Sequence, residues 1–261
     1  MTDPLVPLIQ NLHAQGRLRA WSLIITVFGD MVQHRGGAIS SGRLGQLLGR
    51  VGVEAGTMRT AISRLGQDGW ITGERRGRSS DYRLRPDGLE RFAPATARIY
   101  APPPGPVSDW ALTVSLTGSG PELRIAPASE AEESADLRVE GRLTALSEAY
   151  RAHLLPAAYR AALAGLAHDL RALDVPLPDP LDAAAARMLL IHRWRRIVLR
   201  YPDLPPALMP ADAPLADPRR AVADAYRRIA PLAETWLDVG EDALPPAAPA
   251  FLARFGGLQQ A

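Results

Sequence analysis

Residues 39–84 read ISSGRLGQLLGRVGVEAGTMRTAISRLGQDGWITGERRGRSSDYRL, a stretch in which two helical patterns are followed by a hairpin pattern. Ser40 or Ser41 can cap a first helix that continues to about Arg50, and the residues VGV then make a short turn. A second helix is predicted over 54–67, and the turn-forming pair DG ends it. WITGER and SDYRL are typical of two strands joined by the tip RGRS. Helix, turn, helix and basic hairpin in this order indicate a winged helix-turn-helix.

The predicted second helix has two distinct faces. Its apolar residues follow the spacing i, i+3, i+4 and i+7 and so form one stripe that must face a core: Met58, Ala61, Ile62 and Leu65. The opposite side carries small and hydrogen-bonding residues flanked by arginines, which suits the major groove, while the hairpin arginines suit phosphates. A solvated helix surface without any partner shows a similar polar pattern. We expect DNA contacts from Ser41, Arg43, Gly56, Thr57, Arg59, Thr60, Ser63, Arg64, Gln67, Arg75, Arg76, Arg78, Ser79 and Ser80.

The length and composition limit the classes of protein to which this chain can belong. At 261 residues the chain is long enough for about two domains, and its 47% of hydrophobic residues can build a sizeable core. There is no cysteine, and all 30 basic residues are arginine. Disulfides, cysteine nucleophiles, Schiff-base lysines and Walker-type phosphate loops are therefore excluded. The 5 histidines are too scattered to suggest a metal site. We expect no enzyme, no cofactor and no metal.

The net charge of +2 is unevenly spread along the chain. Residues 1–100 contain 14 arginines against 8 acidic residues, whereas residues 101–180 contain 6 arginines against 11 acidic residues. The basic part is the one that contains the two predicted helices and the hairpin, as a phosphate-bearing partner requires. The longest apolar run, WSLIITVF, is too short to cross a membrane, and the N-terminus lacks a secretory signal. A cytoplasmic protein without membrane contact is expected.

Hydrophobic patterns and prolines organise the rest of the chain. LRAWSLIITVFGDMVQHRGG is compatible with a buried strand or a buried helix, and helix is favoured because the apolar pattern continues past Gly29. APPPGP at 101–106 is the clearest linker, and WALTVSL, ELRIAP and DLRVEG after it indicate short strands. From about Arg142 the pattern is helical, and Asp179–Pro180 and Asp217–Pro218 open two of the helices.

This organisation predicts a mainly α fold with small β. Residues 1–100 would form the winged helix-turn-helix domain with flanking helices. Residues 101–141 would form a proline-rich linker and a short β-containing middle segment. Residues 142–261 would form an all-α C-terminal domain for effector binding and dimerisation.

A cluster of arginines marks the helix that contains IHRWRRIVLR. Arg193, Arg196 and Arg200 lie within a narrow sector of this helix, so their charges repel one another unless an anion lies beside them. We expect these three residues and His192 to bind the phosphates of a coenzyme A-type effector. The alternative is ion pairing with local carboxylates such as Asp203 or Asp212. A lone histidine among apolar neighbours is also more often a packed residue than a ligand-binding one.

SLIITVFGD, RTAISRLGQDGW and SSDYRLRPDGLERF together resemble the PaaX family, repressors of phenylacetate-degradation operons. LLIHRWRRIVLRYPDLPPALMPAD with DAYRRIAPLAETWL is similar to that family's C-terminal domain. The resemblance covers about residues 19–100 and 180–237. It implies a homodimeric winged-helix repressor that leaves its operator when an aromatic acyl-coenzyme A thioester binds. By position it also places Arg59, Thr60, Ser63 and Arg64 on the recognition helix and 75–80 on the wing.

The middle of the chain departs from the family pattern. Members usually have a ferredoxin-like central domain, but only about 40 residues stand between the proline linker and the helical half here. We therefore expect a trimmed sheet in this region.

These features favour a DNA-binding repressor of a catabolic operon that is released from double-stranded operator DNA by a small molecule. Two winged modules of a homodimer would reach successive major grooves about 34 Å apart, so the operator should be an imperfect palindrome. One competing interpretation is effector-independent binding of structured RNA or bulk DNA. The other is a thioesterase fused to a DNA-binding module, but the chain has no serine elbow, cysteine or lysine to support it.

Overall fold

The computed structural model describes residues 3–14, 19–77 and 79–258 of the chain. They form two compact units, of which the larger combines 1–103, 157–203 and 217–261 and the smaller combines 104–156 and 204–216. Both units are built from helices and small antiparallel sheets. The expected fold class, mainly α with small β, is confirmed at this level.

The helices of the larger unit mostly begin where the sequence places a cap or a proline. Asp179 caps α8 by accepting a hydrogen bond from the amide of Asp182 at 2.9 Å, and Asp217 caps α9 in the same way. The helices are α1 Val6–Ala14, α2 Ala20–Val27, the π-helical turn η1 Phe28–Val32, α3 Ser41–Arg50, α4 Ala55–Gln67, α5 Pro86–Ile99, α7 Ala157–Ala172, α8 Pro180–Val198, α9 Pro218–Asp238, α10 Pro249–Leu252 and the 3-10 turn η4 Arg254–Gly256.

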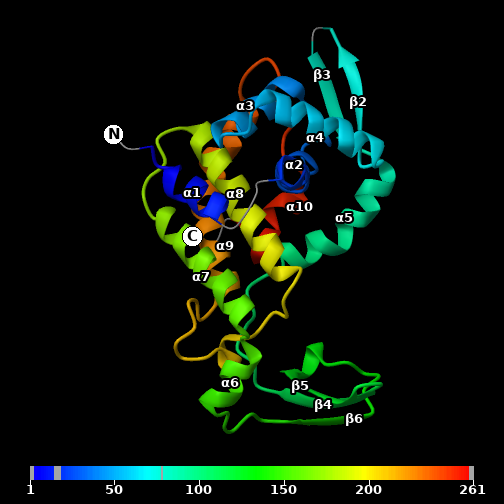
Figure 1. Ribbon diagram of the computed structural model, residues 1–261, viewed down its shortest axis with the longest axis vertical. Helices are drawn as coiled ribbons and strands as arrows, with labels where there is room; N and C mark the ends of the chain where they lie inside the picture. Colours follow the sequence, from blue (N-terminus) through cyan, green and yellow to red (C-terminus); the bar gives the residue numbers. More distant parts are fainter. Residues whose placement is uncertain (1–2, 15–18, 78, 259–261) are drawn as a thin grey trace. The chain divides into compact units, whose positions relative to one another are not determined.

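Helix α8 forms the centre of the larger unit. Every residue from Asp182 to Trp194 is buried, and α9 packs along its length (Figure 1). Helices α2, α3 and α7 also contact α8. Inside this core Arg187 of α8 donates to the carboxylate of Asp30 in η1 at 2.7 Å, and both side chains are fully buried. The N-terminal and C-terminal helices therefore share one hydrophobic core.

This shared core divides the chain differently from the three consecutive segments expected at 1–100, 101–141 and 142–261. The N-terminal helices pack against α8, so the larger unit includes most of both outer segments. Sequence periodicity shows which residues of a helix are buried but not which distant helix covers them.

A three-stranded sheet in the larger unit has the order β1-β3-β2. Strands β2 Ile71–Arg76 and β3 Ser79–Leu84 form the expected hairpin, which projects beyond α3 and α4 (Figure 1). Strand β1 Ala38–Ser40 pairs with β3, with Ile39 opposite Tyr82. This short strand was not predicted, because three residues are too few to show a period-two pattern.

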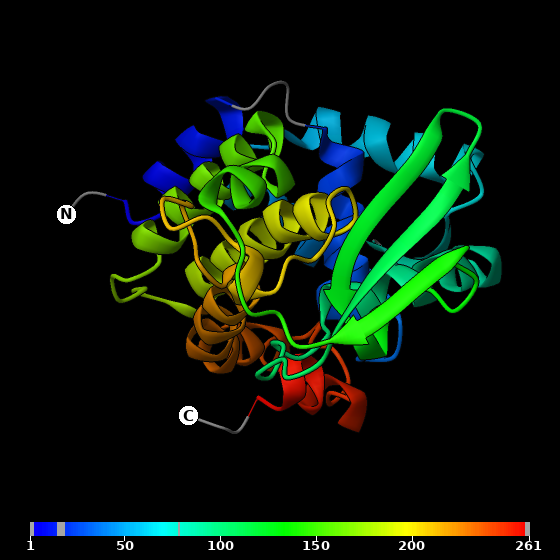
Figure 2. The same ribbon diagram turned by 90° about the horizontal axis from the view of Figure 1, so that it is seen from below.

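The smaller unit contains the other antiparallel sheet, of order β5-β4-β6 (Figure 2). Its elements are β4 Trp110–Thr117, β5 Gly120–Pro127, the 3-10 turn η2 Ala128–Glu130, β6 Leu137–Gly141, α6 Glu148–Leu154 and the 3-10 turn η3 Pro206–Leu208. The three strands coincide with the segments predicted from WALTVSL, ELRIAP and DLRVEG.

One face of the β5-β4-β6 sheet is apolar and exposed. Val114 of β4 lies opposite Leu123 of β5 and Leu137 of β6, and directly paired residues point to the same face of a sheet. Leu123 and Leu137 are 51% and 53% exposed. Alternation along the strands adds Leu112, Leu116, Ile125 and Val139 to this face. We call these seven residues the apolar sheet face.

Candidate nucleic-acid interface and anion pocket

Helices α3 and α4 end in the same way, which fixes the tight turn between them. At the end of α3 the amides of Gly52 and Val53 donate to the carbonyls of Gly49 and Leu48, and Gly52 has a positive φ of 83°. At the end of α4 Gly69 and Trp70 repeat this arrangement, with φ 75° at Gly69. These are Schellman motifs, which require the left-handed conformation that glycine adopts without strain.

Helix α4 buries the predicted stripe and exposes the predicted polar side. Met58, Ala61 and Leu65 are buried and Ile62 is half-buried. Arg64 lies 3.7 Å from Asp68, but both side chains are mostly exposed, so the pair leaves the guanidinium accessible to solvent. All seven predicted DNA-contacting residues of the helix are exposed: Gly56, Thr57, Arg59, Thr60, Ser63, Arg64 and Gln67.

The hairpin places more polar groups next to α3. Arg75 and Arg76 are exposed, and Arg76 lies 3.6 Å from Asp81. The hydroxyl of Ser41 at the start of α3 lies 3.1 Å from that of Ser79 and accepts a hydrogen bond from the amide of Ser80 at 3.4 Å. These contacts fix the hairpin to the N-terminus of α3. Arg78, predicted at the tip, lies outside the described residues.

Arg43 does not belong to this exposed surface, which corrects the prediction that it contacts DNA. Its side chain is 4% exposed and donates to Asp242 at 2.9 Å and to the carbonyls of Trp236 and Val239. The guanidinium also lies 4.7 Å from the Trp236 ring centroid. Its donors are occupied by the last turn of α9 and the residues that follow it, so Arg43 positions α3 instead of contacting a phosphate. The partners lie nearly 200 residues away, so local sequence gave no signal for them.

The segment that follows α9 also contacts Ser40, the N-cap residue of α3. The hydroxyl of Ser40 accepts a hydrogen bond from the Arg43 amide at 3.0 Å and donates to Asp242. Burial alone would raise the pKa of Asp242, but hydrogen bonds from Ser40 and Arg43 outweigh it and lower the pKa. The ionised Asp242 thus fixes both the first turn of α3 and the Arg43 side chain. We call Ser40, Arg43, Trp236, Val239 and Asp242 the α3 clamp.

A cavity of about 220 Å³ lies beside the predicted arginine cluster of α8. Arg196 and Arg200 are exposed at this cavity, and neither forms an ion pair with a described carboxylate. The cavity is lined by Leu12, Ala162, His192, Arg193, Arg196, Ile197, Arg200 and Tyr201. The structure therefore brings the four predicted effector-binding residues to one cavity, and we call it the anion pocket.

Two of these four residues already have protein partners. Arg193 is 5% exposed and forms an ion pair with Asp169 of α7, so the alternative of carboxylate pairing holds for this residue, although the partner is not Asp203. His192 is buried, and its Nδ1 lies 3.1 Å from the Thr26 hydroxyl. Burial and the nearby charges of Arg195, Arg196 and Arg193 lower the pKa of His192 to about 3, so it stays neutral at pH 7. The positive charge accessible in the pocket comes from Arg196 and Arg200.

Across residues 3–14, 19–77 and 79–258 no group of histidine, aspartate and glutamate side chains is arranged to hold a metal ion. Within the same residues, no helix is both long enough and apolar enough to span a bilayer.

Comparisons with known proteins match both halves of the chain. The family described as PaaX-like protein matches residues 19–88, and the PaaX-like protein C-terminal domain matches residues 142–239. The chain is 31% identical over 286 aligned positions to the transcriptional repressor PaaX of Escherichia coli (strain K12), covering 91% of this chain and 90% of that protein. The solved structure of the uncharacterized protein Rv0674 from Mycobacterium tuberculosis has a TM-score of 0.50 at 19% identity and covers 84% of this chain and 99% of that chain. This last likeness concerns the fold alone.

Proposed function

This chain belongs to the PaaX family, and from that membership we propose that it is a DNA-binding transcriptional repressor in which residues 38–84 act as a winged helix. Helix α4 would enter the major groove as the recognition helix. The β2–β3 hairpin would lie along the phosphate backbone as the wing.

The observation that supports this proposal most directly is the two-sided character of α4. Its apolar stripe is buried apart from the half-buried Ile62, while the polar side is exposed along its whole length. Gly56, Thr60 and Ser63 carry no bulky group, so the backbone can approach base edges, and Arg59 and Arg64 flank them. Exposed arginines on the hairpin add the phosphate contacts that dominate affinity.

A titration of the full-length protein against two duplexes tests the proposal. One duplex contains the DNA upstream of the gene for this chain, and the other is a random sequence of equal length. We expect binding to the first to be tighter by about 10³-fold or more at physiological salt, together with a protected imperfect palindrome in footprinting. Equal affinity for both duplexes would instead support sequence-blind nucleic-acid binding.

We further propose that the anion pocket takes a phosphate of a small-molecule effector, an aromatic acyl-coenzyme A thioester, which releases the protein from its operator. Arg196 and Arg200 supply unpaired positive charge at the cavity. About 220 Å³ suits a phosphate group and not a whole thioester, so the remainder of such an effector must lie outside the pocket.

Isothermal titration with a series of acyl-coenzyme A thioesters tests this site. Replacing both arginines (Arg196→Ala with Arg200→Ala) should weaken binding of the active thioester by at least tenfold. Arg171→Ala removes an exposed arginine of α7 and serves as the control. Unchanged effector affinity in the double variant would contradict the assignment.

Finally, we propose that the protein acts as a homodimer joined through the apolar sheet face. The sequence instead predicts that the helical C-terminal half forms the dimer interface. The sheet face offers a stronger argument because its side chains carry no charge and four of the seven, those of Leu116, Leu123, Leu137 and Val139, are more than half exposed. A second copy is the partner that fits such a face, because two related operator half-sites need two copies and a two-fold interface buries the same patch on both.

A further inference from the structure

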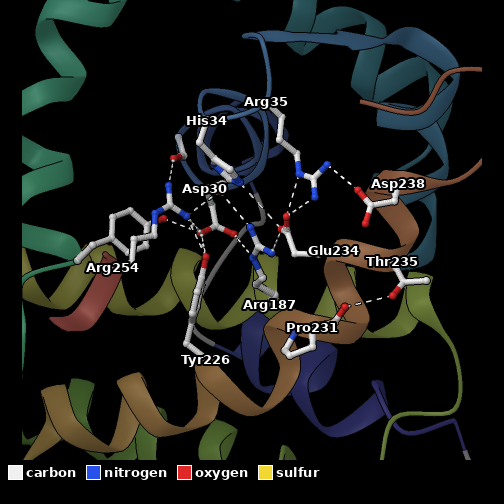
Figure 3. A network of polar contacts seen from close by, with 12 residues as sticks. Asp30, His34, Arg35, Arg187, Tyr226, Pro231, Glu234, Thr235, Asp238 and Arg254 are labelled. Carbon is white, nitrogen blue, oxygen red and sulfur yellow. Dashed lines mark hydrogen bonds and ion pairs between the residues drawn. The ribbon is translucent and has the colours of Figure 1, made fainter. Parts of the chain in front are cut away.

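The arginines at the anion pocket lack the carboxylate partners that the interior arginines have. In the interior of the larger unit three arginines meet three carboxylates in one network: Arg35, Arg187, Arg254, Asp30, Glu234 and Asp238 (Figure 3). Its central hydrogen bond joins Arg187 to Asp30 at 2.7 Å. This network is complete without a ligand. Arg196 and Arg200 have no ion-pair partner among the described residues, so their charge is available to an anion in the pocket.

His192 lies on the same side of α8 as these two arginines. The three residues follow the spacing i, i+4 and i+8, so each lies about one helical turn, or about 5.4 Å along the axis, from the next. All three line the anion pocket. A ligand whose phosphate lies between Arg196 and Arg200 therefore has its neighbouring atoms within reach of the His192 ring.

The contacts of Thr26 in α2 determine which nitrogen of His192 carries the proton. The Thr26 hydroxyl donates its one hydrogen to the Ser22 carbonyl at 3.0 Å, so it cannot also donate to His192. In the 3.1 Å contact between Thr26 Oγ1 and His192 Nδ1 the donor is therefore Nδ1–H. Because His192 is neutral at pH 7, a proton on Nδ1 leaves a free lone pair on Nε2.

The Nε2 atom of His192 is accessible from the anion pocket. It has no hydrogen-bond partner among the described residues, and unlike the ring nitrogens of His34 it is not sealed from solvent. The residue lines the pocket and is 4% exposed. Among the lining side chains, Nε2 and the Tyr201 hydroxyl are the groups that can accept a hydrogen bond. The pocket therefore combines two cations with an acceptor, and the acceptor requires a donor on the ligand.

Building on the proposed effector function of the anion pocket, we propose that His192 selects a ligand with a hydroxyl group next to its phosphate, as in a ribose 3′-phosphate with a free 2′-hydroxyl. The phosphate lies between Arg196 and Arg200, and the hydroxyl donates to His192 Nε2. A diphosphate has no such hydroxyl and leaves Nε2 unpaired. Coenzyme A carries a ribose 3′-phosphate at its nucleotide end, so this end enters the pocket of about 220 Å³ and the acyl end lies outside it.

Isothermal titration of the full-length protein with adenosine 3′-phosphate tests the proposal. The 2′-deoxy analogue lacks the hydroxyl, and the 2′-fluoro analogue carries an atom of similar size that cannot donate. A molecule of this size should bind with a dissociation constant of roughly 1 mM or tighter. We expect adenosine 3′-phosphate to bind about fivefold or more tightly than either analogue, because both leave Nε2 without a donor. Equal binding of the 2′-fluoro analogue overturns the proposal.

Variants distinguish recognition of the hydroxyl from a packing role of His192. His192→Phe keeps a ring but removes Nε2, so it should bind adenosine 3′-phosphate and the 2′-deoxy analogue equally; His192→Leu removes the same atom if His192→Phe fails to fold. His192→Gln offers an amide oxygen in place of Nε2 and should restore part of the preference. His153→Phe replaces an exposed histidine of α6 that does not line the pocket and should keep the full preference. A preference that survives the loss of Nε2 contradicts the assignment.

The same titrations separate this inference from the proposed function of the pocket. Replacing both Arg196 and Arg200 by alanine should weaken binding of all three nucleotides alike, because each of them contains the phosphate. Equal binding of the three nucleotides to the wild type, with loss of binding in the arginine variant, contradicts the role of His192 but not that of the pocket. No binding of adenosine 3′-phosphate to the wild type, or binding that the arginine variant retains, contradicts both.

Discussion

At the scale of single residues, the local surroundings of each arginine separate the groups that are available to a ligand from those that hold the fold together. Arg64 and Arg76 are exposed and only weakly paired, whereas Arg43 and Arg187 are buried with two or more partners each. From the sequence, Arg43 and Arg64 are expected to have the same role, since each lies on a predicted amphipathic helix of the basic N-terminal part. Only the three-dimensional contacts separate them.

Arg64 and Arg76 should affect DNA binding in different ways. Arg64 on α4 can contact base edges, so Arg64→Ala should lower specific affinity by roughly 1–3 kcal/mol and relax base preference. Arg76 on the hairpin can contact phosphate, so Arg76→Ala should weaken binding to all sequences alike and flatten the salt dependence. Gel-shift titrations at two salt concentrations measure both effects. Identical behaviour of the two variants would contradict these roles.

Two buried histidines should make the protein sensitive to mild acid. The pKa of His34 is lowered to about 2 and that of His192 to about 3, in both cases mainly by burial. A histidine in the unfolded chain has a pKa of about 6.5, so above this pH both states are neutral and the stability is unaffected. As the pH falls below 6.5, the unfolded chain binds protons that the folded protein does not bind, and the free energy of unfolding decreases until the pH reaches the folded-state pKa values. For each of the two histidines, the free energy of unfolding should decrease by about 1 kcal/mol for every pH unit below about pH 6.

Guanidinium chloride unfolding at pH 7 and pH 5 measures this loss. His192→Gln should reduce the decrease in unfolding free energy between pH 7 and pH 5 by the part that His192 causes. His13→Gln replaces an exposed histidine of α1 and should show the same decrease as the wild type. A wild-type unfolding free energy that is equal at both pH values would show that neither histidine is held neutral.

At the scale of elements, most helices and strands could be predicted because their signals are local. The caps, the glycine stops and the period of the apolar residues placed α3, α4, α8 and α9 close to their observed bounds. The α3 clamp could not be predicted, because its partners come from segments nearly 200 residues apart and carry no shared pattern. The hydrogen bond between His192 and Thr26 was missed for the same reason, since its partners are 166 residues apart.

The α3 clamp should control how firmly α3, the first helix of the proposed DNA-binding surface, is held. Asp242→Asn removes the charge that faces Arg43 and Ser40, and leaving Arg43 buried with a weaker partner should cost roughly 1–3 kcal/mol. Amide hydrogen exchange should accelerate in α3 more than in α4. Glu241→Gln changes the neighbouring exposed residue and should alter neither quantity. Uniform exchange in both helices would argue against a specific clamp.

At the scale of the whole molecule, the larger unit joins the N-terminal surface to α8 and α9 in one core. A ligand that shifts α8 or the segment after α9 therefore acts on groups that also hold α3. Composition and linker position alone suggested separable domains, because proline-rich segments are the usual sign of a boundary. The buried pairs between Asp30 and both Arg187 and Arg254 join the parts more closely than that pattern indicated.

The apolar sheet face should determine the oligomeric state. Val139→Arg places a charge on this face and should convert a dimer into a monomer of 28.1 kDa in size-exclusion chromatography with light scattering. Operator affinity should fall with it, because a monomer contacts one half-site. Glu122→Arg alters the opposite face of the same sheet and is the control. A wild-type monomer, or a dimer that tolerates Val139→Arg, would exclude this interface.

The buried carboxylate of Asp30 also has a consequence for how the protein is made. Its two arginine partners are translated 157 and 224 residues after it. While a ribosome is still synthesising the chain, the N-terminal helices would have to bury an acid with no compensating cation, which is strongly unfavourable. The nascent N-terminal part should therefore reach its final structure only after Arg187 and Arg254 have been translated, so that shorter chains do not compete for DNA.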